Sequence, residues 1–481
     1  MNPPIPASGP SLRQRARAWA KAAGRRLLAG GPRVTLPPVT WGLDYQHDTL
    51  HLGQMDLQVL LEQHGGPLHV VDEGRLLANL RGFQAPDGEG SGLDIFYSYK
   101  TNPVPWVLRR LHDAGAGAEV ISEYELWLAL RLGVPGARIL YNGPAKSERS
   151  LRWAIEHQIL AVHLNHLEEI DRLQALAQQM GRRVRVALRV TSVNGWTGQF
   201  GFSVEDGQAL AAYRHALAQP ALDVVGVHCH RGVLIRDAAT LSSHLAMLLG
   251  FCDTLQHELG WTPQLLDIGG SLAVPSTRPL TASDTRQASR YLRQPPAPDV
   301  TACLTPEAYA RAAVRQVRAH FSAQGLRVPR LLAEPGRALT GNSQFLLARV
   351  MDVRHATDFD YAILDAGVSV ASIVPGEYHE LLPLRQRSGP PRCHRLVGPI
   401  CHMGDTLYLA RYLPALQPGD ALAILDSGAY FVADASAFSF GRPGVAVVRL
   451  DGSHHMIRAH ESHEHLCALD ALPANPPSTL P

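Results

Sequence analysis

Short apolar runs alternate with longer amphipathic stretches through the middle of the chain. The runs are four to seven residues long and nearly continuous in apolar residues, which is typical of parallel strands covered on both faces. We predict eight such strands, at Phe96–Lys100, Glu119–Ser122, Ile139–Asn142, Ala161–Asn165, Arg185–Val190, Val224–His230, Leu265–Gly269 and Leu331–Glu334. Seven helices are predicted between them, at Trp106–Ala114, Glu123–Leu132, Glu148–His157, Leu167–Met180, Gly207–Ala218, Ala238–Leu259 and Pro306–Gln324.

Eight consecutive strand–helix units predict an α/β fold with a parallel (β/α)8 barrel. An open doubly wound sheet is the rival architecture, and the number of consecutive units disfavours it. After Arg337 short strands alternate with turns, which predicts a C-terminal all-β domain, a barrel or a sandwich. The strands expected there are Gln344–Arg354, Tyr361–Asp365, Cys393–Val397, Ala421–Leu425, Ala446–Leu450 and His454–Arg458.

The chain therefore divides into five predicted parts. Residues 1–40 are expected to be a poorly ordered basic tail, with seven Lys or Arg residues and no acid before Asp44. An organelle leader, or a basic helix on a membrane or nucleic acid, is the alternative for this tail. The other parts are a segment that joins the β domain (41–75), the barrel (76–340), the β domain (341–470) and a disordered tail (471–481). Asp284–Asp299 is expected to be an insertion loop.

Composition narrows the class of protein. Of the 481 residues, 46% are hydrophobic and 18% are charged, as in a globular protein with a large core, and the net charge of +2 gives no reason to expect a nucleic acid partner. We find no apolar run long enough to span a membrane. The six cysteines are scattered without a CxxC pair, so a reducing cytoplasm is expected.

The predicted strand ends carry the candidate chemistry, because active sites of such barrels gather there. Lys100 ends the first strand, and burial would lower its proton affinity and make it a nucleophile toward carbonyls. A lysine that extends to solvent is the alternative. Gly269 and Gly270 could let backbone N–H groups approach a phosphate, and Glu334 and Arg337 end the eighth strand.

Histidine and cysteine residues raise the question of a metal. His228 and His230 share one strand face around Cys229, but no fourth ligand completes a zinc site, so we expect no metal. A ring stacked on a flat cofactor is the better use of His230. In the β domain Cys401 lies in a turn, where a structural thiol is the alternative to a reactive one.

These motifs, in this order, resemble the fold-type III pyridoxal-phosphate (PLP) decarboxylases, which include ornithine, diaminopimelate and arginine decarboxylases. The resemblance runs from about residue 60 to about residue 470. It is carried by Lys100 with Asn102, Asn142-Gly143, Phe200-Gly201, His230-x-Gly232, Asp267-Ile268-Gly269-Gly270, Glu334-Pro335-Gly336-Arg337, Gly398-Pro399-x-Cys401-x-x-x-Asp405 and Gly428-Ala429-Tyr430.

The resemblance implies a role for each matching residue. Lys100 would hold PLP covalently, with His230 stacked on its ring and Glu334 at its pyridine nitrogen. The cofactor would also be held by Gly269, Gly270, Arg337, Tyr430 and Arg189. Cys401 would act in catalysis, and Asp365, His402, Tyr378 and Asp405 would face the substrate. The family assembles as a homodimer with shared active sites, so Cys401 and Asp365 would come from the partner subunit.

PLP would act as the sink for the electrons that decarboxylation leaves at Cα. That sink is strongest when the ring nitrogen is protonated, and Glu334 would favour this state. Alanine racemases of the same broad fold use arginine at that nitrogen, so the glutamate favours a decarboxylase of an amino acid or an amino-acid conjugate. A racemase or epimerase, and a silent PLP-binding homologue, are the alternatives.

Several positions depart from the family pattern. Ser271 replaces the third glycine of the phosphate loop, and Val233 replaces a serine that often binds phosphate. His402 stands where ornithine and diaminopimelate decarboxylases carry an acid, and Val374 where diaminopimelate decarboxylases carry a carboxylate-binding arginine. The catalytic set is kept and the specificity set is altered. We therefore expect a substrate other than meso-diaminopimelate, such as an intermediate of siderophore or other secondary metabolism.

Overall fold

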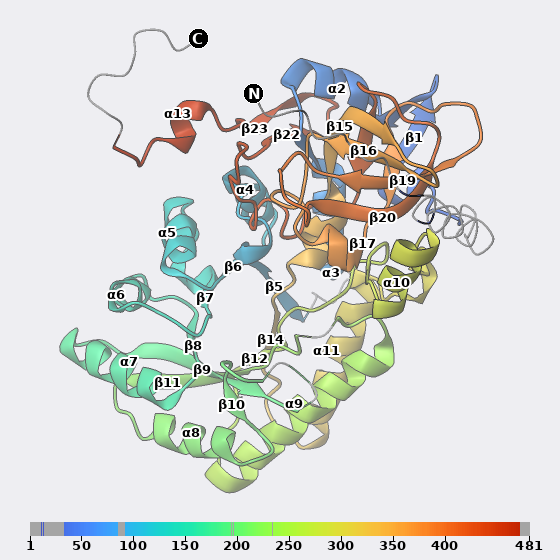
Figure 1. Cartoon of the computed structure of the whole chain (residues 1–481). Helices are drawn as coiled ribbons and strands as arrows, with labels where there is room; N and C mark the ends of the chain where they lie inside the picture. The colour runs from blue at the N-terminus through green and yellow to red at the C-terminus, as the bar shows by residue number, and fades with distance from the viewer. Residues whose placement is uncertain are drawn as a thin grey trace.

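Eight parallel strands close into a barrel in the computed structural model of the chain (Figure 1). The model describes residues 11, 13, 33–84, 92–193, 195, 197–232 and 234–471. Pairing of β8 with β9 and of β14 with β5 completes the ring, which confirms the predicted barrel. Its strands are β5 (Leu93–Ser98), β6 (Gly117–Val120), β7 (Ile139–Tyr141), β8 (Ala161–Leu164), β9 (Val184–Thr191), β11 (Leu222–His228), β12 (Leu265–Asp267) and β14 (Arg330–Ala333).

Helices cover the outside of this barrel, one after nearly every strand (Figure 1). Their apolar faces pack on the outward side chains of the strands in the largest hydrophobic cluster of the described chain. The helices are α3 (Glu73–Gln84), α4 (Pro105–Asp113), α5 (Glu123–Arg131), α6 (Glu148–Glu156), α7 (Leu167–Gln179), α8 (Gln208–Leu217), α9 (Ala238–Leu259) and α11 (Pro306–Ala323). No helix within the described ranges is long and apolar enough to cross a membrane.

The inside of the barrel is filled by a separate apolar cluster, which includes Phe96, Leu140, Ala161, Ala187 and Leu332. Because side chains alternate along a strand, the residues two positions further on also point inward. Those next inward positions are polar, and all of them are buried. We call these eight residues the polar layer: Ser98, Glu119, Asn142, His163, Arg189, His228, Asp267 and Glu334.

The second domain is a β structure above the barrel (Figure 1). Its long strand β15 (Gln344–His355) pairs with β4 (Leu68–Asp72), β16 (Asp360–Leu364) and β21 (Ala421–Ile424). The remaining strands of this sheet are β18 (Leu381–Pro383), β19 (Arg392–Val397), β20 (Thr406–Leu413), β22 (Gly444–Val448) and β23 (His454–Arg458). A hairpin of β1 (Leu43–Gln46) and β2 (Thr49–Leu52), with the short β3 (Met55–Asp56), precedes α2 (Leu57–His64).

The structure corrects four expectations from the sequence. Lys100 lies in the 3-10 turn η2 (Tyr99–Thr101) and not in a strand, because β5 ends at Ser98. The expected insertion loop contains the helix α10 (Ala282–Tyr291), which begins with a capping box at Thr281. The strand β20 was not predicted. The tail was expected to extend to residue 40, but Leu36 is already buried and its N–H donates to Glu380.

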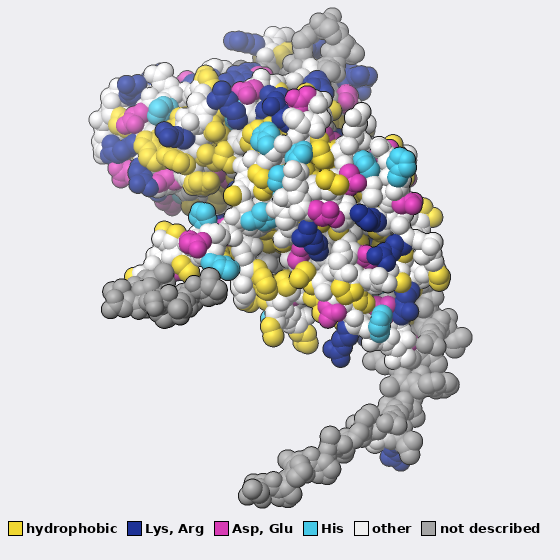
Figure 2. All heavy atoms as spheres, turned by 90° about the horizontal axis from the view of Figure 1, so that it is seen from above, with side chains coloured by type: hydrophobic (Ala, Val, Ile, Leu, Met, Phe, Trp, Pro, Cys, Tyr) yellow, Lys and Arg dark blue, Asp and Glu magenta, His cyan; other side chains and the backbone are white. Residues whose placement is uncertain are grey.

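The predicted disorder of the two tails concerns mainly residues 1–32 and 472–481, and nearly all of these lie outside the described residues. Val233, the predicted departure from the phosphate-binding serine, also lies outside them. Over the part of the surface seen in Figure 2, basic and acidic side chains are interspersed, which fits a net charge of only +2.

A fully buried ion pair stabilises the loops above β7 and β8. Lys146 Nζ lies 2.6 Å from Glu169 Oε1 and donates to the carbonyl oxygens of Gly143 and His163. The other oxygen of Glu169 accepts the N–H of Asn165. Each of these groups depends on the others, because an unpaired charge in this setting has no access to water.

We expect Glu169→Ala to lower the free energy of unfolding by about 3–5 kcal/mol, because it leaves the Lys146 ammonium buried and unpaired. Glu168→Ala is the matched control on the same helix, since the Glu168 side chain is largely exposed, and it should change stability by less than about 0.5 kcal/mol. Urea denaturation of both variants measures this. Equal effects would show that the buried pair is not important for stability.

Candidate active site

A cavity of about 540 Å³ opens above the polar layer, between the barrel and the β domain. Lys100, His230, Glu334, Arg337 and Tyr430 all line it. These five residues come from three different strand-end loops of the barrel and from the β domain, so the fold brings together residues up to 330 positions apart in the sequence. The cavity wall is completed by Ser98, Thr101, Gly232, Leu234, Ser271, Leu272, Pro279, Gly336, Ser372, Ile373, Gly376 and Glu377.

Lys100 is a cation in this cavity, contrary to the expectation that burial would lower its proton affinity. Burial does act to lower the pKa of Lys100, but the nearby Glu119, Tyr430 and Glu334 outweigh it and raise the pKa overall. The lysine must therefore lose a proton to a neighbouring group before it can act as a nucleophile.

Glu119 is a site residue that the sequence analysis did not single out. It is fully buried in β6, and its Oε2 accepts a hydrogen bond of 2.5 Å from Ser98. Burial, followed by repulsion from Glu334, raises the pKa of Glu119 although Lys100 opposes this. A lone acid inside an apolar strand (Gly117-Ala118-Glu119-Val120) was the signal that could have identified it.

Glu334 lies at the centre of the polar layer. Asn142 Nδ2 donates to its Oε1 over 3.1 Å, and His228 Nε2 lies 3.3 Å from its Oε2. Its backbone N–H donates to Gly269, which ties the loop after β14 to the loop after β12. The carboxylate is thus oriented from two sides, in a setting where it can hold a proton on a partner nitrogen.

The loop after β12 packs unusually close to the neighbouring loops. Gly269 has a φ of +67°, and a Cβ at Gly270 would come within 2.4 Å of the carbonyl oxygen of Glu334. Only glycine fits at both positions. Ser271 also has a positive φ, +77°, and its Oγ lies 3.3 Å from His230 Nε2. The N–H of Gly270 donates to the other nitrogen of the same ring.

Arg337 and Tyr430 form the side of the cavity near the β domain. The Arg337 guanidinium lies 5.2 Å from the centre of the Tyr430 ring, and the Tyr430 N–H donates to Thr101. Arg337 Nη1 also lies 2.6 Å from Glu377 Oε1. Glu377 is a second residue that the sequence analysis did not identify, and it neutralises part of the positive charge expected at Arg337.

Arg189 is buried in the polar layer, with its guanidinium 4.4 Å from the ring centre of Phe200. Burial lowers the pKa of Arg189, while Glu334 and Glu119 oppose the shift. Arginine keeps its charge at neutral pH in any protein site. Lys100 and Arg337 therefore give the cavity two cations, and Arg189 adds a third in the polar layer beneath it.

Eight of the predicted site residues do not line this cavity within the described part of the chain: Arg189, Gly269, Gly270, Cys401, His402, Asp405, Asp365 and Tyr378. Cys401 and His402 are exposed on the loop before β20. Asp405 is buried, and its two carboxylate oxygens accept the N–H groups of Val368 and Ile400, so here it orders that loop.

Asp365 and Tyr378 also have partners within their own domain. Asp365 Oδ1 accepts the N–H of Arg349, and burial raises the pKa of Asp365 to about 6. The Tyr378 hydroxyl donates to Glu380 over 2.6 Å. The expected substrate contacts of these residues remain predictions.

The residues present fit PLP. Arg337 in the cavity and Arg189 beneath it match a phosphate, two tightly packed glycines leave room for it, and a buried carboxylate is available for a ring nitrogen. Buried atoms in and beside the cavity also lack protein partners within the described ranges, namely Thr101 Oγ1, Asn142 Oδ1, Glu119 Oε1 and Arg189 Nε. Such atoms are expected where a polar ligand binds.

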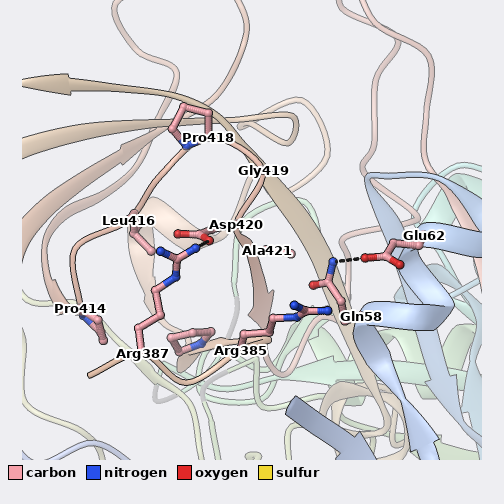
Figure 3. Close-up of a pocket in the computed structure, with 11 residues that line it drawn as sticks. Gln58, Glu62, Arg385, Arg387, Pro414, Leu416, Pro418, Gly419, Asp420 and Ala421 are labelled. Carbon is pink, nitrogen blue, oxygen red and sulfur yellow. Dashed lines mark hydrogen bonds and ion pairs between the residues drawn. The ribbon is translucent and has the colours of Figure 1, made fainter. Parts of the chain in front are cut away.

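A second hollow, of about 330 Å³, lies on the β domain beside α2 (Figure 3). It is polar, but its charged groups are largely engaged with each other. Arg387 pairs with Asp420, and Gln58 donates to Glu62. None of the predicted site residues lines it.

Comparison with known proteins agrees with this site. A family model described as the pyridoxal binding domain of pyridoxal-dependent decarboxylases matches residues 84–341. The diaminopimelate decarboxylase of Pseudomonas aeruginosa is 30% identical over 445 residues, which cover 89% of this chain and 98% of that enzyme. The diaminopimelate decarboxylase of Aquifex aeolicus is 28% identical over 440 residues, which cover 88% and 96%.

Solved structures extend the likeness to the whole fold. The diaminopimelate decarboxylase from M. jannaschii has a TM-score of 0.79 at 25% identity, covering 90% of this chain and 98% of that one. The matched family model includes all barrel strands, and the matched relatives include the β domain as well. This chain belongs to the pyridoxal-dependent decarboxylase family, as a PLP-dependent carboxy-lyase of the diaminopimelate and ornithine decarboxylase type.

Proposed function

We propose that this chain decarboxylates an amino acid that carries an amide or acyl group beyond its α-amino acid part, in the cavity lined by Lys100 and Glu334. The observation that supports the reaction is the convergence of Lys100, His230, Glu334, Arg337 and Tyr430 on one cavity. When bound, PLP supplies the electron sink for the carbanion that loss of CO2 leaves at Cα.

Each residue has a role in this proposal. Lys100 holds the cofactor covalently, the cations Arg189 and Arg337 attract its phosphate, and the Gly269-Gly270 loop leaves room for that phosphate to approach. The His230 ring lies against the cofactor ring. Glu334 keeps a proton on the ring nitrogen, which an arginine at this position would not do.

Glu119 has a role in starting the reaction. Lys100 is held as a cation by its neighbours, and Glu119 is a buried carboxylate with a raised pKa beside it. It is a candidate acceptor for the Lys100 proton, because its burial raises its proton affinity and the transfer removes two charges from a dry site. Ser98 then orients the resulting carboxyl group through its 2.5 Å contact.

The specificity part of the proposal depends on what faces a substrate beyond Cα. Val374 offers no charge where a carboxylate-binding arginine would stand, and Glu377 already pairs with Arg337. A free distal carboxylate of the meso-diaminopimelate kind therefore lacks its cation partners. His402 lacks the negative charge that would attract a distal ammonium.

The second candidate function is decarboxylation of meso-diaminopimelate. It is favoured by the relatives, which are named diaminopimelate decarboxylases, and by the complex of the M. jannaschii enzyme with L-lysine. The altered residues Val374 and His402, together with the ion pair of Glu377 with Arg337, are the reason that we rank it second.

We also propose a homodimer with shared sites in the cytoplasm. Cys401 and His402 are exposed and lie outside the cavity of their own chain, although both are expected to act in catalysis or recognition. A second copy that contributes this loop would complete each site.

The covalent role of Lys100 is tested on the purified protein. We expect borohydride to fix PLP on Lys100, identified by peptide mass, and Lys100→Ala to lower turnover to background because the nucleophile is lost. Lys146→Ala is not a suitable control, since Lys146 is fully buried in an ion pair. The sequence has one further lysine, Lys21, and modification of that residue is compared by mass instead. Full turnover by the Lys100→Ala enzyme would overturn the assignment.

The specificity role of His402 is tested with one added charge. We expect wild-type enzyme to be poor with lysine, ornithine and meso-diaminopimelate, and His402→Glu to raise kcat/KM for the first two by about tenfold to hundredfold, because a charge-assisted bond forms. The matched control is Met403→Glu, which adds the same charge to the next, fully exposed residue and should change little.

Two outcomes count against this reading of specificity. One is ordinary efficiency of the wild-type enzyme with meso-diaminopimelate, which would make the second candidate the correct one. The other is an equal gain in both loop variants, which would indicate long-range attraction rather than contact at residue 402.

The shared site is tested by mixing inactive subunits. We expect Lys100→Ala and Cys401→Ala chains, each inactive alone, to recover about a quarter of the wild-type sites after subunit exchange, since half of the dimers are mixed and each holds one intact site. Subunit exchange is verified with two differently tagged chains. Mixed dimers without activity would mean that both residues act within one chain.

A further inference from the structure

Four buried ionisable groups meet behind the cavity, in the polar layer: His163, His228, Asp267 and Glu334. Their nitrogen and oxygen atoms all lie within 4.8 Å of one another. His163 Nε2 is 3.9 Å from Asp267 Oδ2, and His163 Nδ1 is 3.8 Å from Glu334 Oε1. All four side chains are at least 97% buried. Asp267 and His163 have no role in the proposed function.

Several atoms of this group have no hydrogen-bond partner in the described part of the chain. They are Asp267 Oδ2, His163 Nδ1 and both ring nitrogens of His228. The other oxygen of Asp267 accepts the N–H of Gly269 over 2.9 Å. The free Oδ2 therefore points into the group, and it is the atom at which a proton can be held.

A bound metal ion is one explanation of such a group, but the rings have the wrong arrangement. A ligating nitrogen directs its lone pair in the plane of its ring, so an ion bound by both histidines must lie in both ring planes. The rings of His163 and His228 are stacked instead, with centres 4.5 Å apart and planes at 24°. The geometry favours a proton over a metal ion.

The charges lead to the same conclusion. Two carboxylates this close in a dry interior cannot both stay ionised, because each raises the energy of the other and neither is hydrated. Glu334 has Asn142 as a donor and His228 beside it. Asp267 has a single backbone donor on its other oxygen. The proton is therefore more stable on Asp267.

We propose that Asp267 stays protonated behind the cofactor site and donates its proton toward Glu334, so that it acts as a positioning residue that keeps Glu334 ionised. The stacked rings of His163 and His228 stay neutral and cover the pair of carboxyl groups. The functional consequence rests on the proposed function, because an ionised Glu334 matters only if it faces a ring nitrogen.

The charges that surround Asp267 are consistent with one held proton. Burial, followed by Glu334, raises the pKa of Asp267 well above its usual range, and burial lowers those of His163 and His228. The groups that interact with Asp267 electrostatically, from the elements packed around it, are Glu334, Glu119, His163, Arg189, Cys229 and Tyr309.

The test uses Asp267→Asn, whose amide reproduces the protonated acid in shape and in its ability to donate toward Glu334. We expect the full-length apoprotein of this variant to fold with wild-type circular dichroism. We expect its infrared spectrum to lack one carbonyl band of a protonated carboxylic acid that the wild type shows at pH 7.5 and that shifts in D2O. A variant that cannot fold would overturn the proposal, since an ionised Asp267 would then be required.

Stability against pH gives an independent readout. A protonated Asp267 in the folded chain releases its proton on unfolding, because the pKa of an unfolded aspartate is about 3.9. Its stabilising effect is therefore lost as pH rises toward the folded pKa. From about pH 6.5 to 8, the unfolding constant of the wild type should rise about tenfold per pH unit relative to that of Asp267→Asn.

Asp365→Asn is the matched control. Asp365 is also buried, but its pKa is raised only to about 6, so it is ionised in both states above pH 7 and its variant should run parallel to the wild type there. Parallel curves for Asp267→Asn as well, or one equivalent of metal bound by wild type and lost in the variant, would overturn the proposal. These readouts need no cofactor, so they stand or fall independently of the proposed function.

Discussion

The site depends on one constraint, the passage from an apolar to a polar layer inside a closed barrel. The inward side chains below are apolar and fill the barrel, so the next inward side chains up each strand are sealed from water on that side. Polar groups at those positions can find partners only among themselves or above, in the cavity. The barrel therefore produces a set of polar groups with unsatisfied atoms directed toward one opening.

That arrangement explains why an active lysine here is a cation at rest. Burial alone would favour a neutral Lys100, as for a lysine in an apolar pocket. The acids Glu119 and Glu334 in the layer reverse the balance. The layer holds more acids than bases near the lysine, and it remains stable because some of those acids are protonated or hydrogen-bonded. The site is thus set up to exchange protons internally rather than with water.

Sequence periodicity was enough to predict the barrel and to place Lys100, His230 and Glu334 at the strand ends, where they line the cavity. Buried parallel strands have nearly continuous apolar runs, and the residue that follows such a run lies at the mouth of the barrel, as Glu334 does after β14. The prediction missed Glu119 and His163 because each is a single polar residue within an apolar run. Which side chains of a strand point into the barrel depends on how that strand pairs with its neighbours, and only this pairing shows that Glu119 and His163 face the site. The Glu377–Arg337 pair was missed because it joins elements 40 residues apart.

The same reasoning distinguishes residues that this fold cannot change from residues that it can change. Residues of the polar layer are constrained from every side, so a change at one of them leaves a buried neighbour unpaired. In the proposed function, the residues that would reach a substrate beyond Cα come instead from the short strand β17 (Glu377–Tyr378) and from the exposed loop that carries His402. The exposed loop positions can change charge at little cost to stability, because water solvates their alternatives, whereas Glu377 and Tyr378 are buried and paired. A decarboxylase barrel can therefore acquire a new substrate by changes at this rim while its reaction stays the same.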